Sequence, residues 1–277
     1  MIVTRFAPSP TGLLHLGHAF AAITAAGAGE RFLLRIEDID TGRCRPEFEA
    51  AIFEELHWLG LRWEEPVLRQ SSRFAAYREA LAGLDTQELL YPCFCTRKDI
   101  ADEIARAIEA PHSIYLGPEG PDYPGTCRDL STEIRKSRIE AGEQYALRLD
   151  AAEAAKRTGP LTFTEHSNLV NVDPLLFGDV VLARKDTPAS YHLAVVVDDA
   201  FQGVTLVTRG EDLLPATHIQ RVLQALLNLP QPAYAHHKLI LDEHGKKFSK
   251  RDRSVTLRAL RESGATPEDI RARLTNR

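Results

Sequence analysis

The chain has 277 residues, of which 44% are hydrophobic and 26% are charged, and its formal net charge is −5 at pH 7. These values are typical of a globular enzyme and exclude a low-complexity chain or a strongly basic nucleic-acid-binding protein. No apolar run approaches the about 20 residues of a membrane span, and the N-terminus has the pattern of a strand rather than of a signal peptide. We therefore expect a cytoplasmic protein with no membrane partner.

The first segment combines a strand-like start with a loop and a helix. It runs through two prolines and a glycine into His-Leu-Gly-His at 15–18 and then into an alanine-rich run at 19–28. A helix N-terminus at the end of a strand presents N–H groups and a positive dipole end to an anion. Gly17 has no Cβ to block a nucleotide. His15 and His18 are three residues apart, so they share a helix face and can donate to phosphate oxygens.

A second buried strand is predicted at 31–36, RFLLRI, as part of a parallel sheet. Acidic residues follow it at 37–40. Ligands bind at the carboxyl ends of strands in open α/β sheets, so these carboxylates are candidates for holding a substrate ammonium. A helix is expected at 46–59, with a proline near its start and Gly60 as its stop, and another helix after 71–72.

The stretch 91–179 interrupts this strand–helix alternation with short strands and loops, and it holds three of the four cysteines. Cys93 and Cys95 form a Cys-x-Cys pair, and Cys127 follows, which is one ligand short of a tetrahedral zinc site. The candidates for the fourth ligand are Tyr123, His112 and His166. Cys44 lies elsewhere in the sequence and is expected to be a plain thiol.

The sheet is predicted to resume at 191–197, YHLAVVV, a near-continuous apolar run that ends in two aspartates. Another strand is predicted at 203–207, and it would carry Arg209 at its end. A helix with one buried face is expected at 219–227, then a last strand at 239–241 and two short helices. The second of these helices would begin at the capping sequence 266–269.

A segment of six residues that follows the predicted last strand combines several cations with a serine. It reads Lys246-Lys247-Phe248-Ser249-Lys250-Arg251. A cationic loop beside a glycine suits transient stabilisation of charge on a pyrophosphate leaving group.

The two motifs together resemble the HIGH and KMSKS signatures of the class I aminoacyl-tRNA synthetases. The first reads HLGH here and the second KFSKR, so the two lysines and the serine are kept. The glutamyl branch is indicated by RFAPSPTG at 5–12, RIEDID at 35–40, HLAVVVDD at 192–199 and VTRGEDLL at 207–214. The resemblance runs through nearly the whole chain in order.

The resemblance implies an α/β fold with a class I, Rossmann-like parallel sheet. An inserted acceptor-binding module that contains zinc would split this sheet, and a small helical segment would close the chain. The expected boundaries are 1–90 and 180–235 for the two halves of the catalytic domain, 91–179 for the insertion, and 236–277 for the lysine loop and C-terminal helices.

The resemblance also implies a two-step reaction in which ATP and L-glutamate give glutamyl-adenylate, with Mg²⁺ on the pyrophosphate, and the acyl group then moves to RNA. The implied catalytic residues are His15, His18 and Lys250. The implied ATP-binding residues are His15, Gly17, His18, Lys247, Ser249 and Lys250. The implied glutamate-binding residues are Arg5, Phe6, Ala7, Pro8, Ser9, Glu37, Tyr191 and Arg209. Arginines suit a dicarboxylic substrate because they grip carboxylates with two parallel hydrogen bonds.

The same resemblance implies a set of zinc ligands and an RNA that accepts the glutamyl group. In the glutamyl-queuosine tRNA(Asp) synthetases, a Cys-x-Cys pair, a tyrosine and a cysteine four residues later hold one structural zinc ion, and Tyr123 and Cys127 match that spacing beside Cys93 and Cys95. Only 26 residues follow Arg251, so we expect no anticodon-binding domain. The expected acceptor is the queuosine base of tRNA(Asp), and the expected enzyme is a monomer.

Three other functions remain open at the level of sequence. One is a short glutamyl-tRNA synthetase that charges a tRNA 3′ end. Another is a nucleotidyltransferase that uses H-x-G-H on a small molecule without RNA. A third, a non-catalytic regulatory paralogue, is disfavoured because every expected catalytic position is filled.

Overall fold

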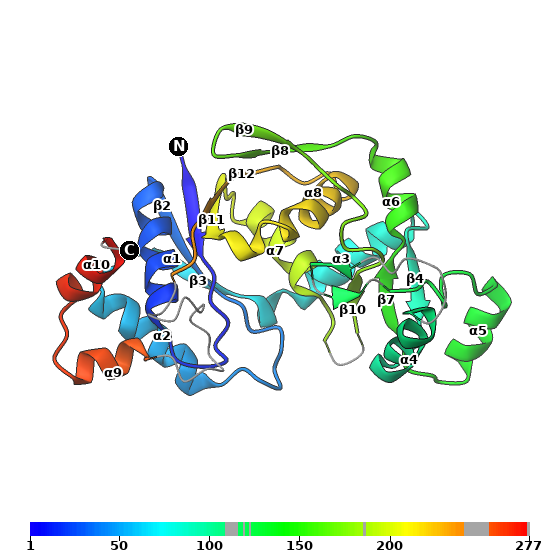
Figure 1. The fold of residues 1–277 in the computed structure, drawn as a ribbon, viewed down its shortest axis with the longest axis horizontal. Helices are drawn as coiled ribbons and strands as arrows, with labels where there is room; N and C mark the ends of the chain where they lie inside the picture. The colour runs from blue at the N-terminus through cyan, green and yellow to red at the C-terminus, as the bar shows by residue number, and fades with distance from the viewer. Residues whose placement is uncertain (109–115, 119, 122, 185–186, 241–254, 276–277) are drawn as a thin grey trace.

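The computed structural model describes residues 1–108, 116–118, 120–121, 123–184, 187–240 and 255–275. Three groups of elements lie along its longest axis (Figure 1). The N-terminal sheet and its helices lie at the left, α7 and α8 lie in the middle, and a sheet built from β4, β7 and β10 lies at the right. In the described part of the chain, no helix has both the length and the apolar character needed to cross a membrane.

The N-terminal sheet is parallel and has the order β1-β2-β3. Its strands are β1 (Val3–Phe6), β2 (Arg31–Ile36) and β3 (Glu64–Arg69). Helices α1 (Leu16–Ala28) and α2 (Pro46–Trp58) connect them. The alanines of α1 are small enough to bring the helix close to the sheet, and its buried residues share one core with β2 and α2. The predicted strand at 31–36 is confirmed, as is the helix that begins at Pro46.

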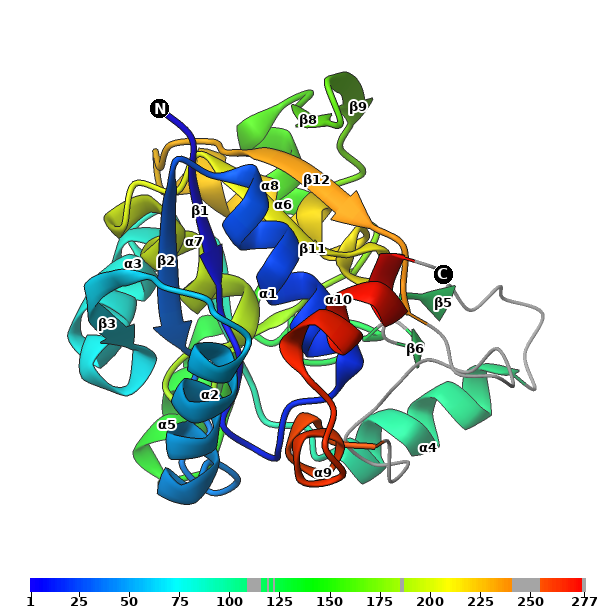
Figure 2. The ribbon, with the colours of Figure 1, turned by 90° about the vertical axis from the view of Figure 1, so that its left-hand side faces the viewer.

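A second sheet has the order β11-β12-β8-β9. Its strands are β11 (Leu206–Gly210), β12 (Ala233–His237), β8 (Thr162–Glu165) and β9 (Asn168–Asn171). Strand β12 is parallel to β11 and β8, and β9 is antiparallel to β8. The two sheets meet edge to edge, because the Thr205 N–H donates to the Val3 carbonyl over 3.0 Å. Figure 2 shows β1 running beside β11 under α1.

The predicted strand at 191–197 is wrong, because these residues form α7 (Tyr191–Phe201). Ser190 caps this helix by accepting a hydrogen bond from the Leu193 N–H over 3.3 Å. The apolar run is continuous because α7 is buried on most sides, by α8 (Ala216–Leu226) and α3 (Phe74–Asp85) among others. A short apolar run cannot by itself distinguish a buried helix from a buried strand.

Two further strand predictions are displaced. The strand expected at 203–207 is β11, which begins at Leu206 and contains Arg209 rather than ending before it. The strand expected at 239–241 is wrong: the last strand of this sheet is β12, Ala233–His237, while residues 239–240 have no assigned strand and residue 241 lies outside the described residues. In β12 the polar histidines and the half-buried alanines hid the strand pattern.

The stretch 91–179 and its borders contribute an antiparallel sheet of order β10-β7-β4. Its strands are β4 (Leu90–Cys93), β7 (Ala146–Leu149) and β10 (Val181–Ala183). Around it lie α4 (Arg97–Ile108), α5 (Thr132–Glu140), α6 (Ala151–Thr158) and the pair β5 (Leu116–Gly117) and β6 (Gly120–Pro121). The β8–β9 hairpin comes from this same stretch, yet it pairs with β12 of the other sheet.

The chain closes with the two expected helices, α9 (Leu257–Glu262) and α10 (Pro267–Thr275). Two short 3₁₀ turns, η1 (Gln70–Arg73) and η2 (Glu211–Leu213), precede α3 and α8. The expected capping start is confirmed: the Asp269 N–H donates to Thr266 Oγ1, and the Thr266 N–H donates to the Asp269 carboxylate. Ile270 and Leu274 pack into the core of the N-terminal sheet.

Candidate active site

A cavity of about 660 Å³ opens between the carboxyl ends of the N-terminal strands, the start of α7 and the β4–β7–β10 sheet. Ser9 and Glu37 line it from the loops after β1 and β2, and Tyr191 lines it from the first turn of α7. On the opposite side its wall includes Tyr123 and Arg148. Its position at the strand ends is the place where open α/β sheets bind ligands, and its size is ordinary for a small-molecule site.

The far wall is held together by charged and aromatic groups. The Arg148 guanidinium carbon lies 3.8 Å from the centre of the Tyr123 ring, and its Nη1 donates to the Asp179 carbonyl. The Asp179 carboxylate accepts hydrogen bonds from the Tyr91 hydroxyl and from Arg128 Nη1, over 2.6 and 2.9 Å. These contacts place the Arg148 guanidinium over the Tyr123 ring in this wall of the cavity.

The His-Leu-Gly-His motif forms the start of α1, as predicted. His15 is the N-cap, its Nδ1 accepts from the Gly17 N–H over 3.1 Å, and His18 Nδ1 accepts from the His15 N–H over 3.2 Å. The ring centres lie 3.8 Å apart. Because each Nδ1 accepts a hydrogen bond and is therefore unprotonated, each neutral ring carries its proton on Nε2. A Cβ at Gly17 would lie 3.1 Å from His15 Cε1, so the glycine also makes room for that ring.

The lysine motif cannot be placed, because Lys247, Ser249 and Lys250 lie outside the described residues. The chain is described again from residue 255, and there it contacts the histidine motif. Thr256 forms an antiparallel bridge with His15, and the Leu257 N–H donates to the Leu14 carbonyl over 2.8 Å. In sequence, Lys250 precedes this contact by six positions.

Arg5 belongs to a buried cluster of four charges. Its Nε donates to Asp199 over 3.0 Å, and Arg35 Nη1 donates to the same carboxylate oxygen over 2.7 Å. Arg35 also pairs with Glu37 at 3.5 Å. Burial alone would raise the pKa of Asp199, but Arg5 and Arg35 more than offset it and hold that pKa below its usual value. Burial raises the pKa of Glu37, and the two guanidiniums only partly oppose it.

Arg209 is the other buried arginine of the predicted set, with a relative exposure of 6%. In the described part of the chain its hydrogen-bond partners are uncharged side chains: the Tyr191 hydroxyl, the Gln220 amide oxygen, the Thr217 hydroxyl and the His236 imidazole. Burial, and then the charge of Arg209, lower the pKa of His236 to about 4, so His236 is neutral at neutral pH. The positive charge of Arg209 therefore has no directly bonded counter-charge among these partners.

Some of the other residues predicted to bind glutamate line the cavity, and others lie in the hydrophobic core or act through their backbone. Ser9, Glu37 and Tyr191 line the cavity, and Tyr191 connects to Arg209 through a 3.2 Å hydrogen bond. The Phe6 side chain is buried in the core of the N-terminal sheet. The Pro8 backbone carbonyl accepts a hydrogen bond from the Glu37 N–H over 3.0 Å. Ala7 lies between Phe6 and Pro8 in the chain.

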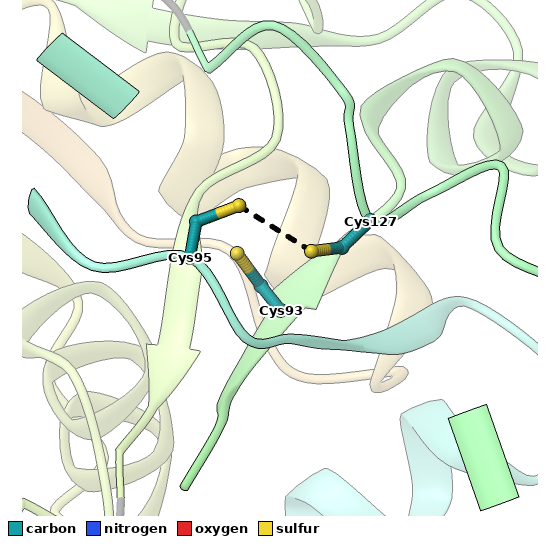
Figure 3. Close-up of side chains that lie close together, drawn as sticks. All are labelled: Cys93, Cys95 and Cys127. Atoms are coloured by element: carbon teal, nitrogen blue, oxygen red, sulfur yellow. Dashed lines mark hydrogen bonds between the residues drawn. The ribbon is translucent and has the colours of Figure 1, made fainter. Parts of the chain in front are cut away.

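The three cysteines of the 91–179 stretch lie together (Figure 3). The Sγ atoms of Cys93, Cys95 and Cys127 are all within 4.8 Å of one another, and those of Cys95 and Cys127 are 3.4 Å apart. Thiolates around a tetrahedral zinc ion are about 3.8 Å apart, given Zn–S bonds of about 2.3 Å. The cluster therefore has a geometry that fits a metal ion.

Tyr123 is the candidate fourth ligand that lies at this cluster. Its hydroxyl oxygen is 3.5 Å from Cys95 Sγ and accepts from the Cys127 N–H over 2.8 Å. His166 lies elsewhere, in the β8–β9 turn, where Nε2 contacts the His236 carbonyl. His112 lies outside the described residues. Burial opposes the thiolate of Cys127, but hydrogen bonds led by that from Tyr123 lower its pKa overall, which favours a metal-binding form.

Sequence reasoning missed several residues that organise the site. Asp199 was noted only as the end of a strand, and Arg35 only as part of a motif, yet Asp199 neutralises Arg5 and Arg35 shares the same carboxylate. His236 and Glu165, which contact Arg209 directly and indirectly, were not considered for the site. No local pattern indicates them, because they come from two strands that become neighbours only in the folded sheet.

The family model described as the catalytic domain of class I tRNA synthetases (E and Q) matches residues 1–277. The chain is 50% identical to the glutamyl-Q tRNA(Asp) synthetase of Rhodobacter capsulatus, over 98% of both chains. It is 44% identical to the enzyme of that name from Nocardia farcinica, over 98% of this chain and 83% of that one. The solved glutamate-tRNA synthetase of Elizabethkingia anophelis superposes with a TM-score of 0.78 at 29% identity, covering 96% of this chain and 59% of that one.

Proposed function

The chain belongs to the family of class I tRNA synthetase catalytic domains that serve glutamate and glutamine, and we propose that it joins L-glutamate to the queuosine base of tRNA(Asp). It first activates glutamate with ATP to glutamyl-adenylate and then transfers the glutamyl group. The observation that carries this proposal is the 50% identity, over 98% of both chains, with a glutamyl-Q tRNA(Asp) synthetase. The chain is a ligase with an α/β class I catalytic fold.

Glutamate recognition rests on Arg209. A buried guanidinium whose bonded partners are uncharged favours an anion, because an uncompensated buried charge is costly. Tyr191 holds this guanidinium and lines the cavity, so a substrate carboxylate placed beside Tyr191 supplies the counter-charge. Glu37 lines the same cavity, and its carboxylate suits the substrate ammonium. Arg5 is already paired with Asp199, so it contributes mainly by holding the charge balance of the cluster.

Glutamate activation rests on the start of α1. An oxygen of the substrate α-carboxylate attacks the α-phosphorus of ATP, and the bond to the bridging oxygen of pyrophosphate breaks. His15 and His18, whose neutral rings carry protons on Nε2, donate to phosphate oxygens, and the N-terminus of α1 adds its positive dipole end. Lys247, Ser249 and Lys250 act on the leaving group. Mg²⁺, when bound with ATP, neutralises charge on the pyrophosphate.

Transfer uses the rest of the cavity. Beyond Glu37 and Tyr191, the cavity continues to Tyr123 and Arg148, whose planar groups are already stacked on each other. A planar base that carries a cyclopentene diol fits such a wall, and a diol oxygen then attacks the acyl carbon and releases AMP. Basic residues of the 91–179 stretch and the C-terminus grip the RNA backbone without reading its sequence.

The metal has a structural role in this proposal. Cys93, Cys95, Cys127 and Tyr123 hold one zinc ion, and four protein ligands leave no open position for catalysis. The ion fixes the stretch that carries Tyr123, which is one wall of the cavity. The enzyme acts as a monomer in the cytoplasm.

Glutamate-dependent exchange between ATP and pyrophosphate tests the first step. We expect exchange with glutamate in the absence of tRNA and little exchange with glutamine. Exchange that requires a substrate other than an amino acid would instead indicate a nucleotidyltransferase. A short glutamyl-tRNA synthetase remains the second candidate, because solved glutamate-tRNA synthetases share the fold at 29–30% identity, and it differs only in the acceptor.

A further inference from the structure

A chain of hydrogen bonds connects Arg209 to the β8–β9 hairpin. Arg209 Nε donates to His236 Nε2 over 3.0 Å, and His236 Nδ1 lies 2.7 Å from Glu165 Oε2. The other oxygen of Glu165 accepts from the backbone N–H of His236 over 2.8 Å. The His236 side chain is 2% exposed and that of Glu165 is 14% exposed. These three side chains come from β11, β12 and β8, which lie next to one another in one sheet.

The protons in this chain can be assigned from donor and acceptor chemistry. A guanidinium Nε carries a hydrogen and can only donate, so His236 Nε2 must be without a proton. The neutral ring then carries its proton on Nδ1, and this Nδ1–H donates to Glu165. The low pKa of His236, which results from burial and the nearby Arg209, keeps the ring neutral. Glu165 therefore selects the tautomer that can accept from Arg209.

We propose that His236 and Glu165 are positioning residues for glutamate recognition, which hold the Arg209 guanidinium through its Nε. Its Nη1 donates to Tyr191 and Gln220 and its Nη2 to Thr217, so Nη2 keeps one hydrogen for the substrate carboxylate. This inference rests on the proposed function, since it takes Arg209 to bind the substrate carboxylate. A carboxylate bonded directly to Arg209 would neutralise it. A neutral imidazole between the two holds the guanidinium in place and keeps the carboxylate one ring away, so the positive charge remains for the substrate.

The arrangement also gives the interrupting stretch a part in amino-acid binding. Glu165 stands in β8, inside 91–179, at the position that pairs with Tyr234 of β12. The hairpin thus reaches back from the stretch that carries the cysteine cluster to the histidine that is bonded to Arg209. A merely structural hairpin would need neither a partly buried carboxylate nor a histidine that faces an arginine.

Glu165→Gln, His236→Ala and His236→Gln test the proposal in glutamate-dependent ATP–pyrophosphate exchange. The glutamine of Glu165→Gln offers one acceptor oxygen where the native carboxylate satisfies two donors, so it favours the wrong tautomer. We expect both Glu165→Gln and His236→Ala to raise the KM for glutamate by roughly tenfold or more, as loss of a hydrogen bond to a charged group does, and to change the KM for ATP by less than about twofold. His236→Gln, whose amide oxygen can accept from Arg209, should recover part of the loss.

Gln231→Ala is the matched control. Gln231 also contacts β8, because its side chain donates to the Thr162 carbonyl, but it is exposed and does not belong to the hydrogen-bond chain formed by Arg209, His236 and Glu165. It should leave both KM values unchanged. Unchanged glutamate KM in both Glu165→Gln and His236→Ala would overturn the proposal. So would an equal rise in the KM values for glutamate and ATP, which indicates general loosening of the fold.

Nitrogen-15 NMR of the histidine rings provides a readout that does not depend on activity. The wild-type signal that disappears in His236→Gln should be that of a neutral ring protonated on Nδ1 at pH 7, and it should shift toward the Nε2 tautomer in Glu165→Gln. A wild-type Nε2 tautomer would contradict the assignment. If the wild type showed no glutamate-dependent exchange, the proposed function would fail while this spectrum still decided whether Glu165 sets the tautomer of His236.

Discussion

Leu257 donates its backbone N–H to the carbonyl of Leu14 over 2.8 Å, so the start of α9 is attached to the loop that leads into His15 and α1. The N–H of the same Leu14 donates to Glu55 Oε2 of α2 over 3.3 Å. The loop is therefore held from both sides, by a buried carboxyl on α2 and by the backbone that follows the lysine motif. This arrangement connects the two halves of the proposed ATP site through the backbone of one residue.

Glu55 should make the stability of the protein depend on pH. Burial raises its pKa from the ordinary 4.5 to about 7, although the hydrogen bond from the Leu14 N–H opposes the shift. Since the folded state binds this proton more tightly than the unfolded chain, the contribution is complete below about pH 4.5 and is lost as pH rises to about 7. Glu55→Gln keeps an acceptor for Leu14 but does not titrate. In thermal melts from pH 5 to 8, its stability should rise relative to that of the wild type. Parallel curves for the two proteins would contradict this expectation.

Asp199 should be essential for stability, because it is the shared partner of Arg5 and Arg35. Asp199→Asn leaves two buried guanidiniums with less compensation, and we expect a loss of about 3 kcal/mol in the free energy of unfolding by urea. Glu64→Gln, which breaks the partly exposed pair with Arg31, should cost far less, because water screens this pair.

The same aspartate should also determine how the stability of the protein falls at acidic pH. Its pKa is lowered in the folded state, so its contribution is present above the unfolded value, about 3.9, and is lost as pH falls below it. The wild type should therefore lose stability below pH 4 more steeply than Asp199→Asn. Equal costs for Asp199→Asn and Glu64→Gln would show that the cluster is not the buried network described.

Metal binding can be tested on the cysteine cluster. We expect one zinc ion per chain in protein purified without chelator, and a clear fall in melting temperature when the ion is removed. Cys95→Ser should lose most of the metal, whereas Cys44→Ser, which changes a cysteine outside the cluster, should retain it. Tyr123→Phe should weaken zinc binding in a competition with a chromogenic chelator. Full metal content with native affinity in Tyr123→Phe would exclude the tyrosine as the fourth ligand.

Lys250 should act on the chemical step. Lys250→Ala is expected to lower the rate of exchange by roughly 10² or more, as the loss of a donor that stabilises transition-state charge does. Lys238→Ala, which removes an exposed lysine near the end of β12, is the control and should have little effect. A near-normal rate in Lys250→Ala would remove this lysine from the mechanism.

The sequence predicted the parts of the fold that local patterns determine. Local patterns within one segment predict the strand at 31–36, the helix that begins at Pro46 and helix α1. These patterns are the spacing of apolar residues, the position of a proline and the polar residue at a helix start. The predictions failed where the secondary structure of a segment depends on its packing against other segments. Residues 191–197 look like a strand because α7 is buried on most of its sides by the surrounding elements, and β12 was overlooked because its own side chains are weakly apolar.

The site shows the same division. The histidines, Glu37, Tyr191 and Arg209 were predicted as site residues because they belong to motifs with fixed spacing. Their supports were not identified. Asp199 neutralises Arg5 from a residue 194 positions away, and Glu165 reaches His236 across 71 positions, so only the folded sheet brings these partners together.

The acceptor is the central claim, and the site of the attached glutamate tests it most directly. The enzyme is given ATP and labelled glutamate in separate reactions with tRNA(Asp) that has or lacks queuosine, with queuosine-containing tRNA(Asp) trimmed of its 3′-terminal adenosine, and with tRNA(Glu). Each product is then cut with a nuclease. We predict label only where queuosine is present, on the anticodon-stem fragment, and equally in the trimmed RNA. Label on the 3′ adenosine of tRNA(Glu), with none on queuosine, would contradict the proposal and identify a short glutamyl-tRNA synthetase.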